Sequence, residues 1–244
     1  MLRKNIVGLL ICIAAMGVTT LGFAGIPDLD TSSCTMLNAP VGVNVNVYNT
    51  PDGSGSLMTE ARAPIFPVPP APGPYSTEED ATITVTLLDS GSNPVFAYPF
   101  EDIWLENPPA VPPVNVGDPA GLVACPNGTI ADASTDINGM TTFSGPFYAG
   151  GHVDYSNDGN DTNDGKTYVM VSGSPLTNGP LLLLFNSADI DGDGLWTTST
   201  DVLLFSQRYP VAAGYHYSVD YYFDERDDIS DLVWFSAARN VQCP

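Results

Sequence analysis

Three aspartates at alternate positions near the end of the chain, closed by a glycine, have the spacing of a calcium loop: Asp189-Ile-Asp191-Gly-Asp193-Gly194. Calcium takes about six to eight oxygen ligands, which such a loop supplies from positions 1, 3, 5, 7, 9 and 12, with glycine at position 6 for the sharp bend. With Asp189 at position 1, the remaining predicted ligands are the Leu195 carbonyl, Thr197 and Asp201. The spacing predicts a Ca2+ site, and a solvated acidic turn is the alternative.

A second copy of the pattern occupies residues 220–231, starting 31 positions after Asp189. Its predicted ligands are Asp220, Asp224, the Arg226 carbonyl, Asp228 and Asp231. Both copies end in an aspartate that is followed by apolar residues and a phenylalanine. Recurrence at a fixed offset indicates a duplication, and each apolar run is expected to form a short helix.

Each copy departs from the ideal loop in its own way. In the first loop the closing acid, Asp201, comes one position late. In the second loop Tyr222 stands where a ligand is expected, and Glu225 replaces the bending glycine. Glycine tolerates a backbone conformation there that a side chain resists. The first loop therefore has good ligands and an unusual closure, whereas the second closes well but lacks one ligand.

Residues 187–244, with these two loops and their apolar runs, resemble a dockerin, the duplicated calcium loop-helix module of bacterial secreted proteins. The resemblance implies calcium in the loops and a cohesin-like protein as the partner. Dockerins recognise that partner through loop positions 10 and 11, which here are Thr198, Ser199, Ile229 and Ser230. The two pairs differ in sequence, so symmetric docking through either loop is not expected.

The two helices, beginning at Asp201 and Asp231, are expected to pack against each other, because helices this short do not persist alone. The predicted contact joins Val202, Leu203 and Phe205 to Leu232, Val233 and Phe235. Trp234 is expected to face the rest of the chain or a partner instead.

The N-terminus has the composition of a secretory signal peptide over residues 1–24. Arg3 and Lys4 precede an apolar run, and Gly22-Phe-Ala24 offers small residues for cleavage. A membrane anchor is the alternative for this run, and no later segment is apolar enough to span a bilayer. We therefore expect a bacterial protein that is secreted or displayed at the cell surface.

The chain is strongly acidic, with 7 Lys and Arg against 28 Asp and Glu and a formal net charge of −21. Such a surface repels phosphate backbones and anionic lipids, which argues against nucleic acid and membrane surfaces as partners. Cations are the natural ligands. Three cysteines follow the predicted signal, Cys34, Cys125 and Cys243, so one disulfide and one remaining thiol are expected, without the spacing showing which pair forms.

The larger part of the chain is predicted to be β. Residues 43–47 and 83–87 alternate apolar and polar side chains as half-buried strands do. Further strands are expected at 141–143, 168–171 and 180–185, with turn-forming residues between them. The fold class is thus mainly β: a β-sandwich over residues 25–186, with a proline-rich connector at 63–75, followed by a small helical module over 187–244.

Two turns sharpen this prediction. A strand leading to Asn93-Pro94, and the later Asp136-Ile-Asn138-Gly139 turn before another strand, resemble the invasin/intimin type of bacterial immunoglobulin-like domain over about residues 75–185. The resemblance implies an immunoglobulin-like sandwich. Self-association through its sheet edges is then a further way for the protein to assemble.

Catalytic motifs are sparse. The histidines, His152 and His216, lack a nucleophile motif, and Glu101, Asp102 and Glu106 fit the polar face or edge of a strand better than a catalytic pair. The sequence predicts a non-catalytic, calcium-binding scaffold, adhesion or extracellular assembly protein. The alternative is a dockerin-bearing component of a cohesin-assembled, polysaccharide-degrading complex, or itself a glycoside hydrolase.

Overall fold

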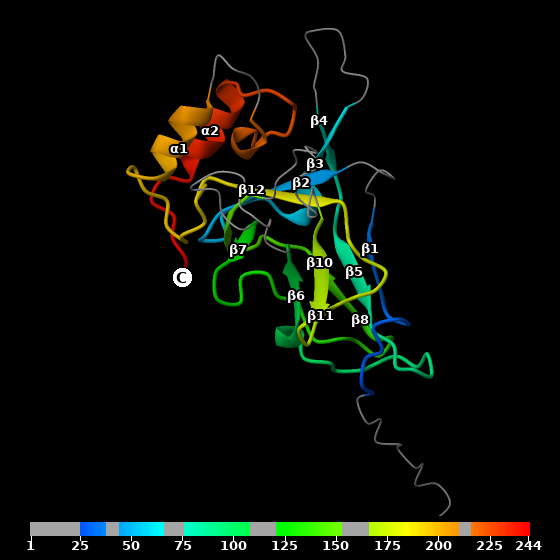
Figure 1. Cartoon of the computed structure of the whole chain (residues 1–244). Helices are drawn as coiled ribbons and strands as arrows, with labels where there is room; N and C mark the ends of the chain where they lie inside the picture. Colours follow the sequence, from blue (N-terminus) through cyan, green and yellow to red (C-terminus); the bar gives the residue numbers. More distant parts are fainter. Residues whose placement is uncertain (1–24, 38–43, 66–75, 108–120, 153–165, 210–215) are drawn as a thin grey trace, which may run out of the picture.

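The computed structural model describes residues 25–37, 44–65, 76–107, 121–152, 166–209 and 216–244 (Figure 1). The predicted signal peptide and residues 66–75 of the predicted connector lie outside these ranges. Within them the protein is mainly β, with two α-helices near the C-terminus.

Two antiparallel three-stranded sheets form the lower half of the molecule in Figure 1. The first has the order β1 (Ser33–Met36), β5 (Ile83–Thr86) and β8 (Met140–Phe143). The second has the order β11 (Ser174–Pro175), β10 (Tyr168–Val171) and β6 (Ile103–Glu106). A short 3-10 turn, η2 (Phe100–Asp102), leads into β6.

A third sheet carries the C-terminal region. Its order is β12 (Leu183–Ser187), β2 (Val45–Asn49), β3 (Ala61–Pro64) and β4 (Ser76–Glu79). β12 and β2 pair in parallel and the other pairs are antiparallel. A 3-10 turn, η1 (Met58–Glu60), precedes β3, and a small ribbon pairs β7 (Leu122–Ala124) with β9 (Ala149–Gly151).

One apolar core lies between these sheets. In β5, Ile83 and Val85 are buried while the threonines between them are half-buried, as the alternating sequence predicts. The core also takes side chains from both sides of the fold, among them Ile103, Phe143 and Phe185. Burial of one face of each sheet against a shared core is the organisation of a β-sandwich. The five predicted strand segments correspond to β2, β5, β8, β10 and β12.

The helices α1 (Asp201–Arg208) and α2 (Ile229–Ala237) begin close to the two closing aspartates, as predicted. A 3-10 turn, η3 (Tyr217–Val219), lies between them in the sequence. Phe205 and Phe235 meet in a second apolar cluster, with stacked rings.

The rest of the predicted helix contact is only partly right. Val202 packs at the edge of the second cluster, but Leu203, Leu232 and Val233 are exposed. A helix of eight or nine residues buries a single stripe of positions about four residues apart. In these helices that stripe contains the closing aspartate and the phenylalanine, which leaves the neighbouring positions facing solvent.

Several contacts join the second cluster and the C-terminus to the sheets. Tyr48 of β2 belongs to it, and its hydroxyl donates to the Trp234 carbonyl at 3.2 Å. The rings of Trp234 and Tyr48 lie edge to face with their centroids 4.8 Å apart, so Trp234 faces the β region, as expected. A disulfide links Cys125, which follows β7, to Cys243 near the C-terminus, and leaves Cys34 as a buried thiol.

Candidate metal centre

The first aspartate loop, residues 189–201 (loop 1), begins two residues after the end of β12. Asp189, Asp191 and Asp193 each offer a carboxylate oxygen, and these oxygens all lie within 4.8 Å of one another. Asp189 is buried, Asp191 is half-buried and Asp193 is exposed. The three predicted ligands thus form one group that runs from the interior to the surface.

Asp189 is the innermost member and has an incomplete set of partners. It is fully buried, and its Oδ2 accepts a hydrogen bond from the Gly194 amide at 2.9 Å. Its Oδ1 is buried without a hydrogen-bond donor. Buried carboxylate oxygens are normally satisfied by donors or by a metal, so this oxygen fits a cation ligand.

Asp201 closes the loop despite its late position. It is fully buried; its Oδ1 accepts from the Ile190 amide and its Oδ2 from the Thr197 amide, both at 2.7 Å. The additional residue is taken up between Thr197 and Asp201, where the hydroxyls of Thr197 and Thr200 are hydrogen-bonded at 2.6 Å. A 13-residue spacing therefore places the carboxylate where a 12-residue loop would have it.

Loop 1 is electrostatically unfavourable in the absence of a cation. Burial raises the pKa of Asp189 to about 7, and the charge of Asp201 contributes to the same shift. Burial also raises the pKa of Asp201 above its usual range. A divalent cation would remove this repulsion and stabilise both carboxylates in their charged form.

Glycines and the disulfide shape loop 1. Gly192 and Gly194 have φ of 69° and 84°, where glycine is the favoured residue. A Cβ on Gly150 of β9 would lie 1.9 Å from Asp189 Oδ2, so only glycine allows that strand to approach the carboxylate. The Cys243 amide donates to the Gly194 carbonyl at 2.8 Å, which fixes the bend beside the disulfide.

The second loop, residues 220–231 (loop 2), repeats the hydrogen bonds of loop 1. The Glu225 amide donates to Asp220 Oδ2 at 2.9 Å, as Gly194 does to Asp189. Asp231 Oδ1 accepts from the Tyr221 amide at 2.8 Å, and its Oδ2 accepts from the Asp228 amide at 2.9 Å. These bonds match those of Asp201, so the predicted loop registers describe equivalent positions.

The backbone of loop 2 follows the same path without glycine. Phe223 and Glu225 have φ of 52° and 62°, at the positions that Gly192 and Gly194 occupy in loop 1. Positive φ at a residue other than glycine is unfavourable by about 1 kcal/mol or more. Contacts outside the loop must therefore hold loop 2 in this shape.

The carboxylates of loop 2 are arranged differently. Burial raises the pKa of Asp224 above its usual range and that of Asp231 to about 7. Among the described residues, however, the close grouping of three potential ligand side chains occurs in loop 1 and not in loop 2. Tyr222 occupies loop position 3, where a ligand is expected, and packs its ring under the Arg62 guanidinium of β3.

The predicted partner-binding positions lie at the surface. Thr198, Ser199 and Ile229 are exposed, and Ser230 is half-buried. The side chains of Leu195 and Arg226, whose carbonyls are the predicted ligands, are exposed as well.

Sequence reasoning did not identify Gly150, Cys243 or Arg62 as parts of this region. Gly150 precedes loop 1 by 39 positions and Arg62 precedes loop 2 by 158, so no local pattern connects them. The folded sheets bring them to the loops.

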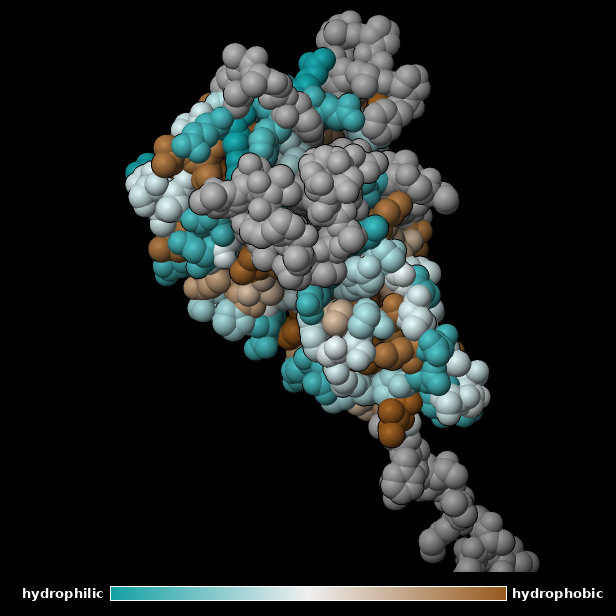
Figure 2. Space-filling view, viewed as in Figure 1, coloured by the Kyte–Doolittle hydropathy of each residue, from teal (hydrophilic) through white to brown (hydrophobic). Residues whose placement is uncertain are grey.

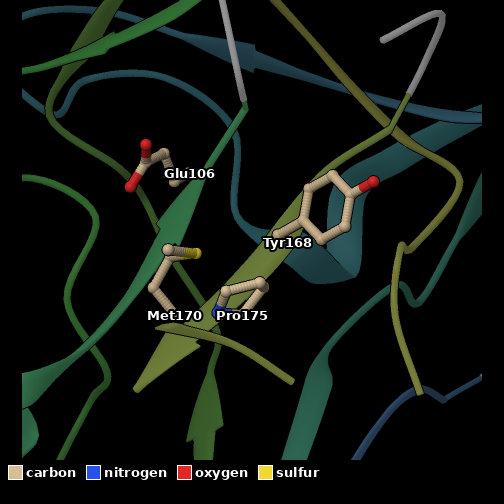
Figure 3. A pocket seen from close by; sticks show the side chains of 4 residues that line it. All are labelled: Glu106, Tyr168, Met170 and Pro175. Carbon is tan, nitrogen blue, oxygen red and sulfur yellow. The ribbon is translucent and has the colours of Figure 1, made fainter. Parts of the chain in front are cut away.

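A separate hollow of about 180 Å3 lies on the outer face of the β6–β10–β11 sheet (Figure 3). Its described lining consists of Glu106, Tyr168, Met170 and Pro175. Glu106 is the one carboxylate in this lining, and it accepts a hydrogen bond from the Trp104 indole at 3.1 Å. Glycoside hydrolysis uses two carboxyl groups that flank the scissile bond, and these lining residues do not provide the pair.

Comparisons with known proteins add little to this geometry. The sequence matches no protein-family model and no curated protein. Among solved structures, the chain is similar to one described as the crystal structure of the Lin-41 filamin domain, with 11% sequence identity and a TM-score of 0.26. The match covers 67% of this chain and 97% of that one. A TM-score this low supports no conclusion about fold or function. None of the helices in the described part of the chain is long and apolar enough to cross a membrane.

Proposed function

We propose that this protein is a calcium-binding, non-catalytic scaffold, adhesion or assembly protein that acts outside the cell, with its calcium site in loop 1. The observation that carries the proposal is Asp189: its Oδ1 is buried without a donor, and one of its carboxylate oxygens lies within 4.8 Å of oxygens of Asp191 and Asp193.

The chemistry of the ligands favours calcium. All three grouped side chains are carboxylates, which suit hard cations, whereas zinc and copper sites use histidine or cysteine. Magnesium requires a compact octahedral site and keeps several waters, whereas calcium accepts more ligands in a flexible arrangement. A loop with a 13-residue spacing, in which Asp191 is half-buried and Asp193 exposed, suits the more tolerant ion.

The proposed role of calcium is to stabilise the junction between β12 of the sheet and helix α1. Asp189 lies two residues after the end of β12 and Asp201 is the first residue of α1, and both are fully buried. An ion between them would neutralise the charges that burial makes unfavourable, and so would stabilise the joint. Ions that bind only the folded state raise its stability by mass action.

Thermal unfolding tests this proposal. The melting temperature should rise when millimolar calcium replaces chelator, and should rise much less with the same concentration of magnesium. Asp193→Ala should reduce the calcium response more than Asp227→Ala, because Asp227 occupies a loop position that supplies no ligand. Equal melting curves in chelator and in calcium would refute the proposal.

Assembly through a cohesin-like partner is the second candidate function. It is favoured by the exposure of Thr198, Ser199 and Ile229, with Ile229 66% exposed. On the face seen in Figure 2, hydrophobic residues are scattered and do not form one continuous patch, so a partner would use a few specific contacts. Ile229→Glu should abolish binding to a cohesin-like protein, with Leu203→Glu as the matched control on an exposed position of α1.

The proposal of a non-catalytic protein has its own test. Purified protein should release no reducing sugar from a panel of plant and microbial glycans in calcium buffer. Release that disappears in a Glu106→Gln variant would instead support the glycoside hydrolase alternative.

A further inference from the structure

The two loops share a backbone but differ at the oxygen that would face a metal. In loop 1, Asp189 Oδ2 accepts from a backbone amide and Oδ1 is left without a donor. In loop 2 both oxygens of Asp220 accept from backbone amides, Oδ1 from Asp224 at 3.2 Å and Oδ2 from Glu225 at 2.9 Å. The first aspartate of loop 2 is therefore already satisfied by the protein.

The third position of loop 2 is occupied by a contact with the sheet. Tyr222 has no carboxylate, and the Arg62 guanidinium carbon lies 3.7 Å from the centre of its ring. A cation over an aromatic face is attracted to it, and arginine is common in this role. The Tyr222 carbonyl also accepts from the Ser76 hydroxyl of β4 at 3.0 Å.

Arg62 is itself held in place by the sheet. Its Nη2 donates to Glu78 Oε1 at 3.1 Å and its Nη1 donates to the Ser76 hydroxyl at 3.3 Å. Its side chain is only 14% exposed. Burial and the charge of Asp228 raise the pKa of Asp224, and the charges of Arg226 and, less strongly, Arg62 oppose this shift, so the charge of Arg62 acts on loop 2 as well.

The fourth position of loop 2 anchors it to the β core. Phe223 is 4% exposed and belongs to the core cluster formed by the sheets, whereas Tyr221 of the same loop belongs to the helix cluster. Burial of the Phe223 side chain stabilises the fold and so offsets the unfavourable φ of Phe223 and Glu225. The equivalent residue of loop 1 is Gly192, which has no such anchor.

We infer that loop 2 is a metal-free latch, in which Arg62 and Phe223 take the place of a calcium ion and fasten the helices to the β3–β4 edge. The protein therefore binds one calcium ion per chain, in loop 1. This inference rests on the proposed calcium site, and it departs from the two ions that the loop duplication alone would predict.

Asp224 and Asp227 could still serve a metal, since Oδ1 of each is buried without a hydrogen-bond donor. Two such oxygens are not enough, because calcium needs about six to eight ligands. In loop 1 the carboxylate oxygens of Asp189, Asp191 and Asp193 lie within 4.8 Å of one another, and the described residues of loop 2 form no such group of three. Near Asp224 the negative charge of Asp228 is opposed by the positive charges of Arg226 and Arg62.

Counting bound ions tests the inference. Native mass spectrometry of the purified protein in calcium should show one ion per chain, none for Asp189→Asn, and one for Asp224→Asn. Two ions on the wild-type chain, with one lost in Asp224→Asn, would overturn the inference while leaving the calcium proposal intact. No ion on the wild-type chain would instead refute the calcium proposal itself.

Thermal unfolding tests the contact between Arg62 and loop 2 without a substitution in the loop itself. Arg62→Gln should lower the melting temperature by about 2–4 °C, and by a similar amount in chelator and in calcium, because Arg62 acts where no metal binds. Arg239→Gln removes the same charge from an exposed position after α2 and should have little effect. An effect of Arg62→Gln no larger than that of Arg239→Gln would overturn the role given to Arg62.

Discussion

The rings of Phe205 and Phe235 stack with their centroids 4.1 Å apart and their planes at 12°. Each phenylalanine lies four residues after the closing aspartate of its loop, Asp201 or Asp231. Residues four apart share one face of a helix. The same helix face therefore closes a loop and forms the contact between α1 and α2, which couples the two loops through their helices.

Phe205→Ala and Phe235→Ala should each lower the free energy of unfolding by about 3–5 kcal/mol, because both rings are buried in a cluster that cannot easily collapse. Leu203→Ala is the matched control, since Leu203 is 52% exposed and its loss should change stability by no more than about 0.5 kcal/mol. Chemical denaturation in calcium measures all three. Equal effects of Leu203→Ala and Phe205→Ala would contradict the packing described here.

Gly150→Ala should weaken calcium binding, because the added Cβ would lie 1.9 Å from Asp189 Oδ2 and would displace that carboxylate. Gly173→Ala is the control: Gly173, unlike Gly150, has positive φ, 84°, but an added Cβ there meets no atom within 4 Å. Both variants should lose some stability, but only Gly150→Ala should lose calcium affinity in a calorimetric titration. An unchanged affinity in Gly150→Ala would place the metal away from Asp189.

The sequence predicted five of the strands and the positions of the two aspartate loops, because each has a local signal. It did not predict the other strands, and β3 (Ala61–Pro64) extends into the predicted connector at 63–75. Alternation placed Ile83 and Val85 in the core, and aspartate spacing placed Asp189, Asp191 and Asp193 together. The contacts that distinguish the two loops come from the sheets, and a local pattern cannot predict them. The pairing of Cys125 with Cys243 is likewise set by the fold.

The sequence also did not predict which apolar side chains of each short helix are buried. Apolar runs after both loops predicted helices, but several apolar side chains compete for the narrow buried stripe, and periodicity over two turns does not rank them. Leu203 and Val233 therefore face solvent, although Phe205, two residues after Leu203, and Trp234, next to Val233, pack in the second apolar cluster.

The calcium-free protein should lose stability as the pH rises. Burial, with the charge of Asp201 next, raises the pKa of Asp189 from 3.8 to about 7, and burial raises that of Asp231 similarly. A carboxyl whose pKa is higher in the folded state stabilises folding fully below its unfolded pKa, and that contribution is lost as the pH rises through the folded pKa. The loss should therefore occur between pH 3.8 and about 7.

Calcium affinity should rise over the same range, because the ligands must be deprotonated to bind a metal. The difference in melting temperature between calcium-loaded and calcium-depleted protein should then widen from low pH to about pH 7. Melting curves at a series of pH values, with and without calcium, measure this. A difference that stays constant with pH would show that no raised carboxyl pKa contributes to the site.

The disulfide should stabilise both the fold and loop 1. It joins residues separated by 118 positions, and closing a loop of that length contributes about 4–5 kcal/mol in the chain-entropy account. Cys125→Ser with Cys243→Ser should lower the free energy of unfolding and also weaken calcium binding, since Cys243 is hydrogen-bonded to Gly194. A double variant with unchanged affinity would show that loop 1 is formed independently of the C-terminus.

The most direct test of the calcium site uses terbium, which replaces calcium and becomes luminescent when a nearby tryptophan is excited. Trp196 lies within loop 1, and Asp189 is the innermost predicted ligand. Above the raised Asp189 pKa of about 7, the wild-type protein should give terbium luminescence that calcium suppresses. Asp189→Asn should abolish it, and Asp136→Asn, an exposed turn aspartate, should not. Luminescence in Asp189→Asn equal to that of the wild-type protein would contradict the proposed site.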